Sequence, residues 1–203
     1  MSSRENYATL RRLGADVIQT ADAAAALRQS TSAAAKTLSR LAAAGLVSAV
    51  RHGTWWIDGP VDPYRLPPYL TAPLESYISL QTALHLHGLI EQIPEVIYAA
   101  SLARTQRIAT RAGSFSIHHL APQVFGGYEE TERGVKLASA EKALFDFAYL
   151  SAGRSRLFTA LPELELPRGF RRAELKRWIS KIPSERSRTI TARKLAEIMH
   201  PAA

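Results

Sequence analysis

The sequence predicts an α+β protein in two parts. Segments with helical periodicity alternate with short apolar stretches that have the pattern of strands, so both kinds of element are expected. A proline-rich linker, residues 60–67, separates a smaller first part from a larger second part. We therefore expect one domain over residues 1–59 and another over residues 68–203. The second is expected to be a mixed domain in which helices surround a small antiparallel sheet.

Three helices are expected in the first part. Residues 5–13 are amphipathic, and a run of strong helix formers follows Thr20, a residue type that is common at helix N-termini. The third helix is expected over residues 32–44, with Gly45 ending it. Apolar residues recur at helical spacing along this helix, which predicts a buried stripe made of Ala34, Ala35, Leu38 and Leu41.

A β-hairpin is expected to follow the third helix. Residues 46–50 alternate as a strand, residues 51–54 contain a glycine turn, and residues 55–57 form the returning strand. Two helices joined by a tight turn and followed by a hairpin are typical of a winged helix-turn-helix, whose second helix enters the DNA major groove. The alternative is a module of the same kind that binds protein or that only dimerises.

The DNA-binding candidates lie opposite the buried stripe and at the hairpin tip. A recognition helix needs small side chains where it approaches the duplex, and it needs donors for base edges and phosphates. These requirements select Ser32, Lys36, Thr37, Arg40, Arg51 and His52. The expected partner of this surface is operator DNA.

Positive charge is concentrated toward the two ends of the sequence. The formal net charge is +8, with +3 in residues 1–60, −2 in residues 61–150 and +7 in residues 151–203. A basic surface attracts phosphate polymers and acidic proteins alike. An amphipathic helix near residues 168–181 carries the candidates for partner binding, which are Arg171, Arg172, Lys176 and Arg177. A solvated face, an acidic partner or RNA, and a second DNA contact remain open for this end.

The second part is expected to begin with a helix and to continue into strands. The helix is predicted over residues 74–87, and Ser139 is expected to cap another helix that runs to about residue 149. Between them, three strands are predicted over residues 96–100, 114–118 and 134–137.

Two stretches of the second part resemble the AbiEi family, the antitoxins of type IV abortive-infection toxin–antitoxin systems. They are Thr-Ala-Leu-His-Leu-His-Gly-Leu at 82–89 and Leu-Ala-Ser-Ala-Glu-Lys-Ala-Leu-Phe-Asp at 137–146. The resemblance extends over the N-terminal part, the linker and most of the C-terminal region. It implies a DNA-binding N-terminal domain that represses its own operon. It also implies a C-terminal domain that neutralises a co-encoded nucleotidyltransferase-like toxin, directly or indirectly.

The second of these stretches contains three charged residues on one helix. Lys142 and Asp146 are four residues apart, which predicts an ion pair on the helix surface, and Glu141 near the N-terminus fits the helix dipole. The alternative is an atypical phosphotransferase that modifies the toxin and uses ATP and Mg²⁺, with these three residues as its catalytic groups. The sequence has no phosphate-binding glycine loop of the common kinds. A third possibility is a regulator that senses a ligand.

Several classes of protein and site are excluded or disfavoured. The chain has no cysteine, which excludes disulfides and cysteine-ligated metals. The histidine pairs 85/87 and 118/119 point their members to different faces of a helix or strand, so no metal site is expected. For an antitoxin no cofactor is expected. The sequence has no apolar run long enough to span a membrane and no hydrophobic signal core, so we expect a cytoplasmic protein.

Overall fold

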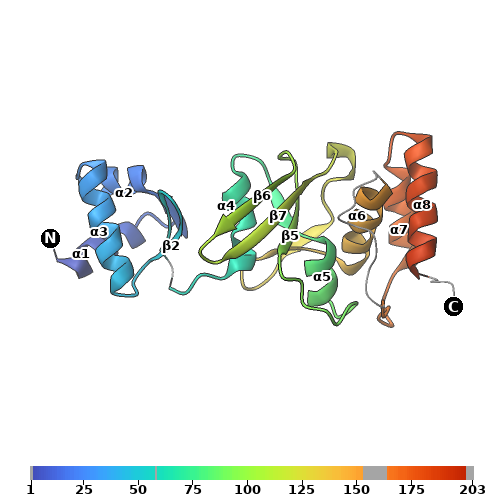
Figure 1. Ribbon diagram of the computed structural model, residues 1–203, viewed down its shortest axis with the longest axis horizontal. Coiled ribbons are helices and arrows are strands. Elements are labelled where there is room, and N and C mark those ends of the chain that lie inside the picture. Colours follow the sequence, from blue (N-terminus) through green and yellow to red (C-terminus); the bar gives the residue numbers. More distant parts are fainter. Residues whose placement is uncertain (1, 58, 153–163, 200–203) are drawn as a thin grey trace. The chain divides into compact units, whose positions relative to one another are not determined.

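A computed structural model describes residues 2–57, 59–152 and 164–199 (Figure 1). In these residues the chain is a mixed α/β protein with eight α-helices, a three-stranded sheet and a six-stranded sheet. The chain divides into two units. The first consists of Met1–Pro63 with Ala109–Gly113, and the second of Tyr64–Ile108 with Ser114–Ala203. The predicted combination of helices and sheets is confirmed.

The first unit contains three helices and one antiparallel sheet with the strand order β1-β3-β2. Helix α3 begins after Ser30, whose Oγ accepts a hydrogen bond from the Ala33 N–H at 3.2 Å. Gly45 follows this helix with a φ of +72°, which confirms that the helix ends there. The elements are α1 (Ser3–Arg11), β1 (Val17–Gln19), α2 (Thr20–Leu27), α3 (Thr31–Ala43), β2 (Ser48–Arg51) and β3 (Thr54–Trp56).

Helix α3 packs one of its sides into the core of the first unit. Leu38 and Leu41 of α3 are fully buried, and burial of each side chain contributes about 2 kcal/mol. Their neighbours in the core come from the other two helices, from β1 and from residues next to β2 and β3, namely Leu10, Leu27, Ile18, Val47 and Ile57. Because the apolar stripe of α3 faces inward, the opposite side of this helix is left at the surface.

The second unit is built on the six-stranded sheet, with the strand order β6-β7-β5-β4-β9-β8. Its strands are β4 (Ser76–Ile78), β5 (Ile97–Ser101), β6 (Gln106–Thr110), β7 (Gly113–His119), β8 (Tyr128–Glu130) and β9 (Lys136–Ala138). Its α-helices are α4 (Pro67–Thr71), α5 (Leu80–Leu86), α6 (Ala140–Ala152), α7 (Arg172–Ser180) and α8 (Glu185–Met199), and short 3₁₀ turns lie at Pro63–Arg65 and Pro122–Val124.

Two predictions for this unit are wrong. The sheet is mixed, because β4 pairs in parallel with β9 and β5 pairs in parallel with β7, whereas β4–β5 and β8–β9 are antiparallel. The predicted helix over residues 74–87 divides into strand β4 and helix α5. A short apolar run such as Ser76–Ile78 does not distinguish a buried strand from a helix by its periodicity. Pairing with β5 and β9 on either side decides in favour of the strand.

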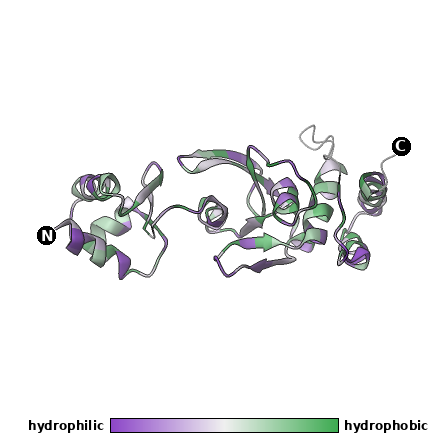
Figure 2. Cartoon of the chain, turned by 90° about the horizontal axis from the view of Figure 1, so that it is seen from below, coloured by the Kyte–Doolittle hydropathy of each residue, from purple (hydrophilic) through white to green (hydrophobic). Residues whose placement is uncertain are grey.

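Helix α6 lies at the centre of the second unit and connects the sheet to the last two helices. Its residues 141–148 are all buried, and Phe145 packs among side chains of the sheet and of α7. Helices α7 and α8 pack against α6, on the red side of Figure 1. In Figure 2, green marks hydrophobic residues along the strands of this unit and along the helix beside them.

Candidate functional site

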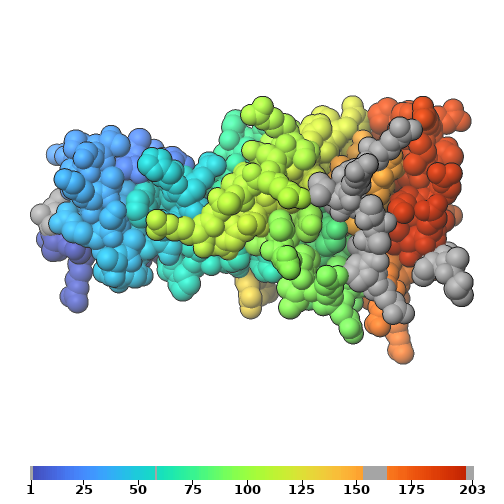
Figure 3. All heavy atoms as spheres, viewed as in Figure 1, coloured from blue at the N-terminus to red at the C-terminus, as the bar shows by residue number. Residues whose placement is uncertain are grey.

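A groove in the first unit brings together three of the six predicted DNA-binding residues. It lies between the outer side of α3, the first residues of α2 and the hairpin β2–β3, and Figure 3 shows α3 and the hairpin at the surface of this unit. Its lining includes Thr20, Ala21, Thr31, Ser32, Ala35, Ser39, Ala49, Arg51, His52, Gly53 and Trp55. The α3 side of the groove carries small side chains, and the hairpin side carries a cation.

The predicted residues fall at three places relative to this groove. Ser32, Arg51 and His52 line it and are exposed. Lys36 and Arg40 are exposed on α3 outside the groove lining. The Arg40 guanidinium lies along its own helix, with Nε donating to the Lys36 carbonyl at 3.4 Å.

Thr37 does not lie on the exposed side of α3, so that prediction is wrong. The residue is 3% exposed, and its Oγ1 donates to Gln29 Oε1 at 3.0 Å and accepts from an Arg40 N–H at 3.3 Å. The physical reason is the helical period. Thr37 is three residues after Ala34 and four before Leu41, so it lies on their buried stripe. In this conformation Thr37 orients Gln29 and Arg40.

Three α3 residues that line the groove, Thr31, Ala35 and Ser39, were not predicted as DNA-binding residues. Ser39 is exposed and lies seven residues after Ser32, two helical turns along the same side. Ala35, predicted to be in the buried stripe, is half-buried and also lines the groove. The spacing of Ser32, Ala35 and Ser39 could have predicted this row, because i, i+3 and i+7 lie on one side of a helix. This side is different from the one that carries Leu38 and Leu41.

Two charged residues of α6, Lys142 and Asp146, form a buried cluster with polar groups of β4 and the turn after it. Lys142 and Asp146 are both 0% exposed, so the prediction of an ion pair on the helix surface is wrong. The Lys142 ammonium donates to Asp146 Oδ1. Asp146 Oδ2 accepts from Ser79 Oγ at 2.7 Å and from the Tyr77 hydroxyl at 3.1 Å, so β4 and the turn after it supply the remaining donors.

Aromatic rings surround the Lys142 ammonium on its other sides. It lies 4.6 Å from the ring centroid of Trp178, 5.1 Å from that of Phe145 and 5.5 Å from that of Tyr77, within the range of cation–π attraction. Burial lowers the pKa of Lys142 and raises the pKa of Asp146, and their mutual attraction opposes both shifts. The cluster therefore joins α6 to β4 on one side and to α7 on the other.

Glu141 joins the same helix to the start of α7. Its Oε1 accepts a hydrogen bond from the Arg171 backbone N–H at 2.8 Å, at the N-cap of α7. Burial raises the pKa of Glu141, but this hydrogen bond and the Arg171 charge outweigh it, so the pKa lies below its ordinary value. The three residues named for the phosphotransferase alternative thus hold the fold together, and Lys142 and Asp146 have no surface left for a nucleotide.

A charge-removing substitution at Glu141 should therefore destabilise the protein in a pH-dependent way. We expect Glu141→Gln to lower the free energy of unfolding by about 1 kcal/mol at pH 7, because a neutral acceptor replaces a charged one. A carboxyl whose pKa is depressed on folding contributes stability above its unfolded value, and this contribution is lost as the pH falls. The difference between wild type and variant should shrink below pH 4.5, the ordinary value. Urea unfolding from pH 7 to well below pH 4.5 measures it, and a constant difference over this range would contradict the assignment.

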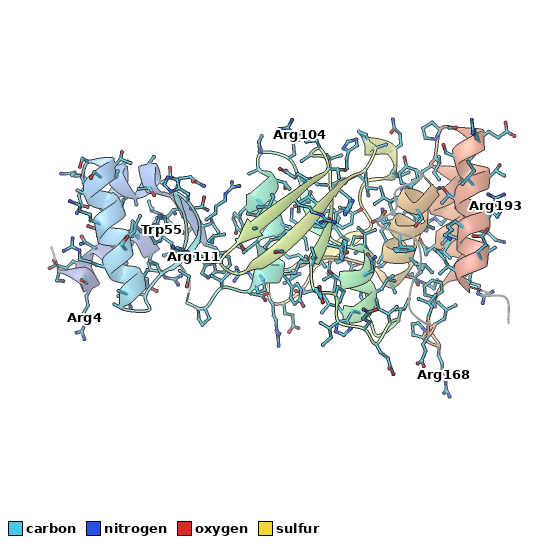
Figure 4. All side chains as sticks on the ribbon, viewed as in Figure 1. Arg4, Trp55, Arg104, Arg111, Arg168 and Arg193 are labelled. Carbon is cyan, nitrogen blue, oxygen red and sulfur yellow. The ribbon has the colours of Figure 1, made fainter. Side chains whose placement is uncertain are left out.

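The predicted partner-binding residues lie on or beside α7. Arg171 and Arg177 are 66% and 75% exposed at their side chains. Arg177 pairs with Glu174 at 2.9 Å, and Arg172 and Lys176 are also exposed. These four exposed residues place positive charge along α7. Figure 4 shows another cation, Arg193, on α8.

His85, His87 and His118 each lie within hydrogen-bond distance of another group of the second unit. His87 Nε2 lies 2.7 Å from the Ala138 carbonyl oxygen, and His85 Nδ1 lies 3.3 Å from that of Ile90. His118 lies 2.8 Å from Ser116 Oγ, and burial lowers its pKa to about 4. Within the described ranges, no group of three or more His, Asp or Glu side chains is placed to hold a metal ion. Within the same ranges, no helix has the length and apolar character needed to cross a membrane.

No protein-family model matches the chain, and no curated protein sequence matches it either. The AbiEi resemblance therefore depends on the two quoted stretches, and it remains a prediction.

Proposed function

We propose that this chain is a DNA-binding repressor of its own operon and an antitoxin of the AbiEi type. In this proposal the first unit is a winged helix-turn-helix, with α3 as its recognition helix and the β2–β3 hairpin as its wing. The observation that carries the proposal is the groove between α3 and the hairpin. Its lining combines small side chains on the helix with cationic and polar groups at the hairpin tip.

The outer side of α3 has the properties of a surface that enters the major groove. Ser32, Ala35 and Ser39 are small, so the helix backbone can approach base edges closely, and the two hydroxyls can donate or accept. Lys36 and Arg40 flank this row as exposed cations. They can reach phosphates or, for Arg40, the acceptor pair of a guanine.

The hairpin tip has the properties of a wing that contacts the DNA backbone. Arg51 and His52 are exposed at the end of β2 and in the turn that follows. A cation here supplies a salt-dependent contact, because each phosphate that is neutralised releases counterions. Base reading by α3 and backbone contact by the tip together give both specificity and affinity.

The first prediction of this proposal concerns Arg40. We expect Arg40→Ala to weaken binding to the duplex upstream of the gene by about 1–3 kcal/mol, because a contact to a base or phosphate is lost. The matched control is Arg4→Ala, which removes the same charge from the first helix, at the far end of this unit from Trp55 in Figure 4. Fluorescence anisotropy with a labelled duplex measures both. Equal effects of the two substitutions would remove Arg40 from the DNA-reading side.

The antitoxin half of the proposal is supported by the AbiEi resemblance. It is tested by co-expressing the chain with the nucleotidyltransferase-like protein encoded beside it. Growth arrest by that protein should be relieved when the chain is present. Arrest that persists would contradict this half, and the DNA-binding half would be unaffected.

A further inference from the structure

The hairpin tip is held to helix α2 by a short chain of hydrogen bonds. The indole N–H of Trp55 donates to Thr20 Oγ1 at 3.0 Å, and Thr20 Oγ1 donates to the Gly53 carbonyl at 3.3 Å. The backbone N–H of Thr20 donates to the same carbonyl at 2.8 Å. A hydroxyl has one proton to give and can also accept, so Thr20 passes the contact from the indole to the turn.

The strand pairing is irregular next to the hairpin tip. In the β2–β3 ladder Ala49 pairs with Trp55 and Arg51 pairs with Thr54, so Val50 is an extra residue in β2. A bulge of this kind interrupts the ladder next to the turn and changes the direction of the strand. Gly53 in the turn has a φ of +74°. The position of Arg51 and His52 therefore depends on what the turn is tied to.

The two neighbouring tryptophans of β3 point to opposite faces of the sheet, because successive side chains of a strand alternate. Trp56 is fully buried, whereas Trp55 is half-buried and lines the groove. Figure 4 shows Trp55 beside the hairpin strands. The Trp55 ring lines the groove, and its indole N–H donates to the Thr20 hydroxyl. Trp55 therefore connects the groove to the first residue of α2.

We propose that Trp55 is a positioning residue for DNA binding, which sets the wing through its indole N–H and Thr20. This inference rests on the proposed function. It adds Trp55 as a residue that affects DNA affinity indirectly, by holding Arg51 and His52 in position. A tip that is fixed before binding loses less conformational freedom on the DNA than a mobile one. Trp55→Phe keeps an aromatic ring and removes the N–H, so it isolates this contribution.

The test is a double-mutant cycle on the upstream duplex. Trp55→Phe should weaken binding about threefold to tenfold, the range that one net hydrogen bond supports, and should reduce the salt dependence. In the double variant Arg51→Ala/His52→Ala, the same substitution should have no further effect, because the tip no longer contributes. Thr20→Val should reproduce the result of Trp55→Phe. Unchanged binding, or an equal loss in both backgrounds, would overturn the inference.

Hydrogen exchange of the free protein tests the anchor without DNA. In Trp55→Phe the amide of Thr20, which donates to Gly53, should exchange about threefold to tenfold faster, because the tip opens more often. The amide of Leu46, which donates to Leu41 at the end of α3, is the internal control and should not change. An unchanged Thr20 amide would overturn the inference. Faster exchange in a protein that does not prefer its upstream DNA would instead refute the proposed function alone.

Discussion

Asp146→Ala should lower the free energy of unfolding by about 3–5 kcal/mol, the largest effect expected of any substitution considered for this protein. The substitution leaves the Lys142 ammonium fully buried with no carboxylate beside it. It also removes the acceptor of the Tyr77 and Ser79 hydroxyls. The aromatic rings around Lys142 attract the charge but do not replace an ion-pair partner, since a cation–π contact supplies about 0.5–2 kcal/mol.

Two further variants separate the buried charge from other causes. Lys142→Met/Asp146→Leu removes both charges with side chains of similar size, and should recover most of the loss. Arg177→Ala breaks the exposed ion pair with Glu174 and should change stability by less than about 1 kcal/mol. Urea unfolding at pH 7 measures all three. A double variant as unstable as Asp146→Ala would show that the loss comes from packing or from the unpaired Tyr77 and Ser79 hydroxyls, and not from an unpaired charge.

Gly127→Ala should destabilise the protein by about 2–4 kcal/mol, because the added methyl group would clash with side chains of the buried Lys142 cluster. A Cβ at this position would lie 2.5 Å from Cζ2 of Trp178 and 3.1 Å from Cγ and Cδ of Lys142. Trp178 is buried and its ring cannot move aside without separating α7 from α6. The φ of +73° adds the cost of a left-handed conformation for alanine.

Gly88→Ala is the matched control for this substitution. Its φ of +72° is nearly the same, but a Cβ there would have no heavy atom within 4 Å. We expect a cost of about 1–2 kcal/mol, which is the backbone contribution alone. Thermal unfolding of both variants gives the comparison. Equal losses at the two glycines would mean that Gly127 is not in contact with Trp178.

Local signals in the sequence predicted the helices of the first unit well. Helix α3 begins at Thr31, one residue before the predicted start, Gly45 follows its end, and the apolar spacing of Ala34, Leu38 and Leu41 places this stripe in the core. Each of these depends on residues within one or two turns of each other, where spacing alone carries the information. The same spacing also places Thr37 on the buried side, because Thr37 is three residues after Ala34 and four residues before Leu41.

The features that the sequence did not predict depend on contacts between distant segments. The i, i+4 spacing of Lys142 and Asp146 is the same for an exposed pair and for a buried one, and Trp178 and Tyr77 decide the outcome. Strand β4 is recognisable once β5 and β9 lie beside it. Parallel pairing of β5 with β7 likewise depends on the path of the chain between them, which the residues of either strand do not encode.

A titration of the full chain with its own upstream duplex and with a scrambled duplex of equal length tests the claim that the chain reads the sequence of its upstream DNA. It is carried out at two salt concentrations. Contacts to base edges predict tighter binding to the upstream duplex, with a preference that persists at the higher salt concentration. Equal affinity for both duplexes with the same steep loss in salt would contradict the claim. It would mean that the net charge of +8 alone draws the chain to DNA.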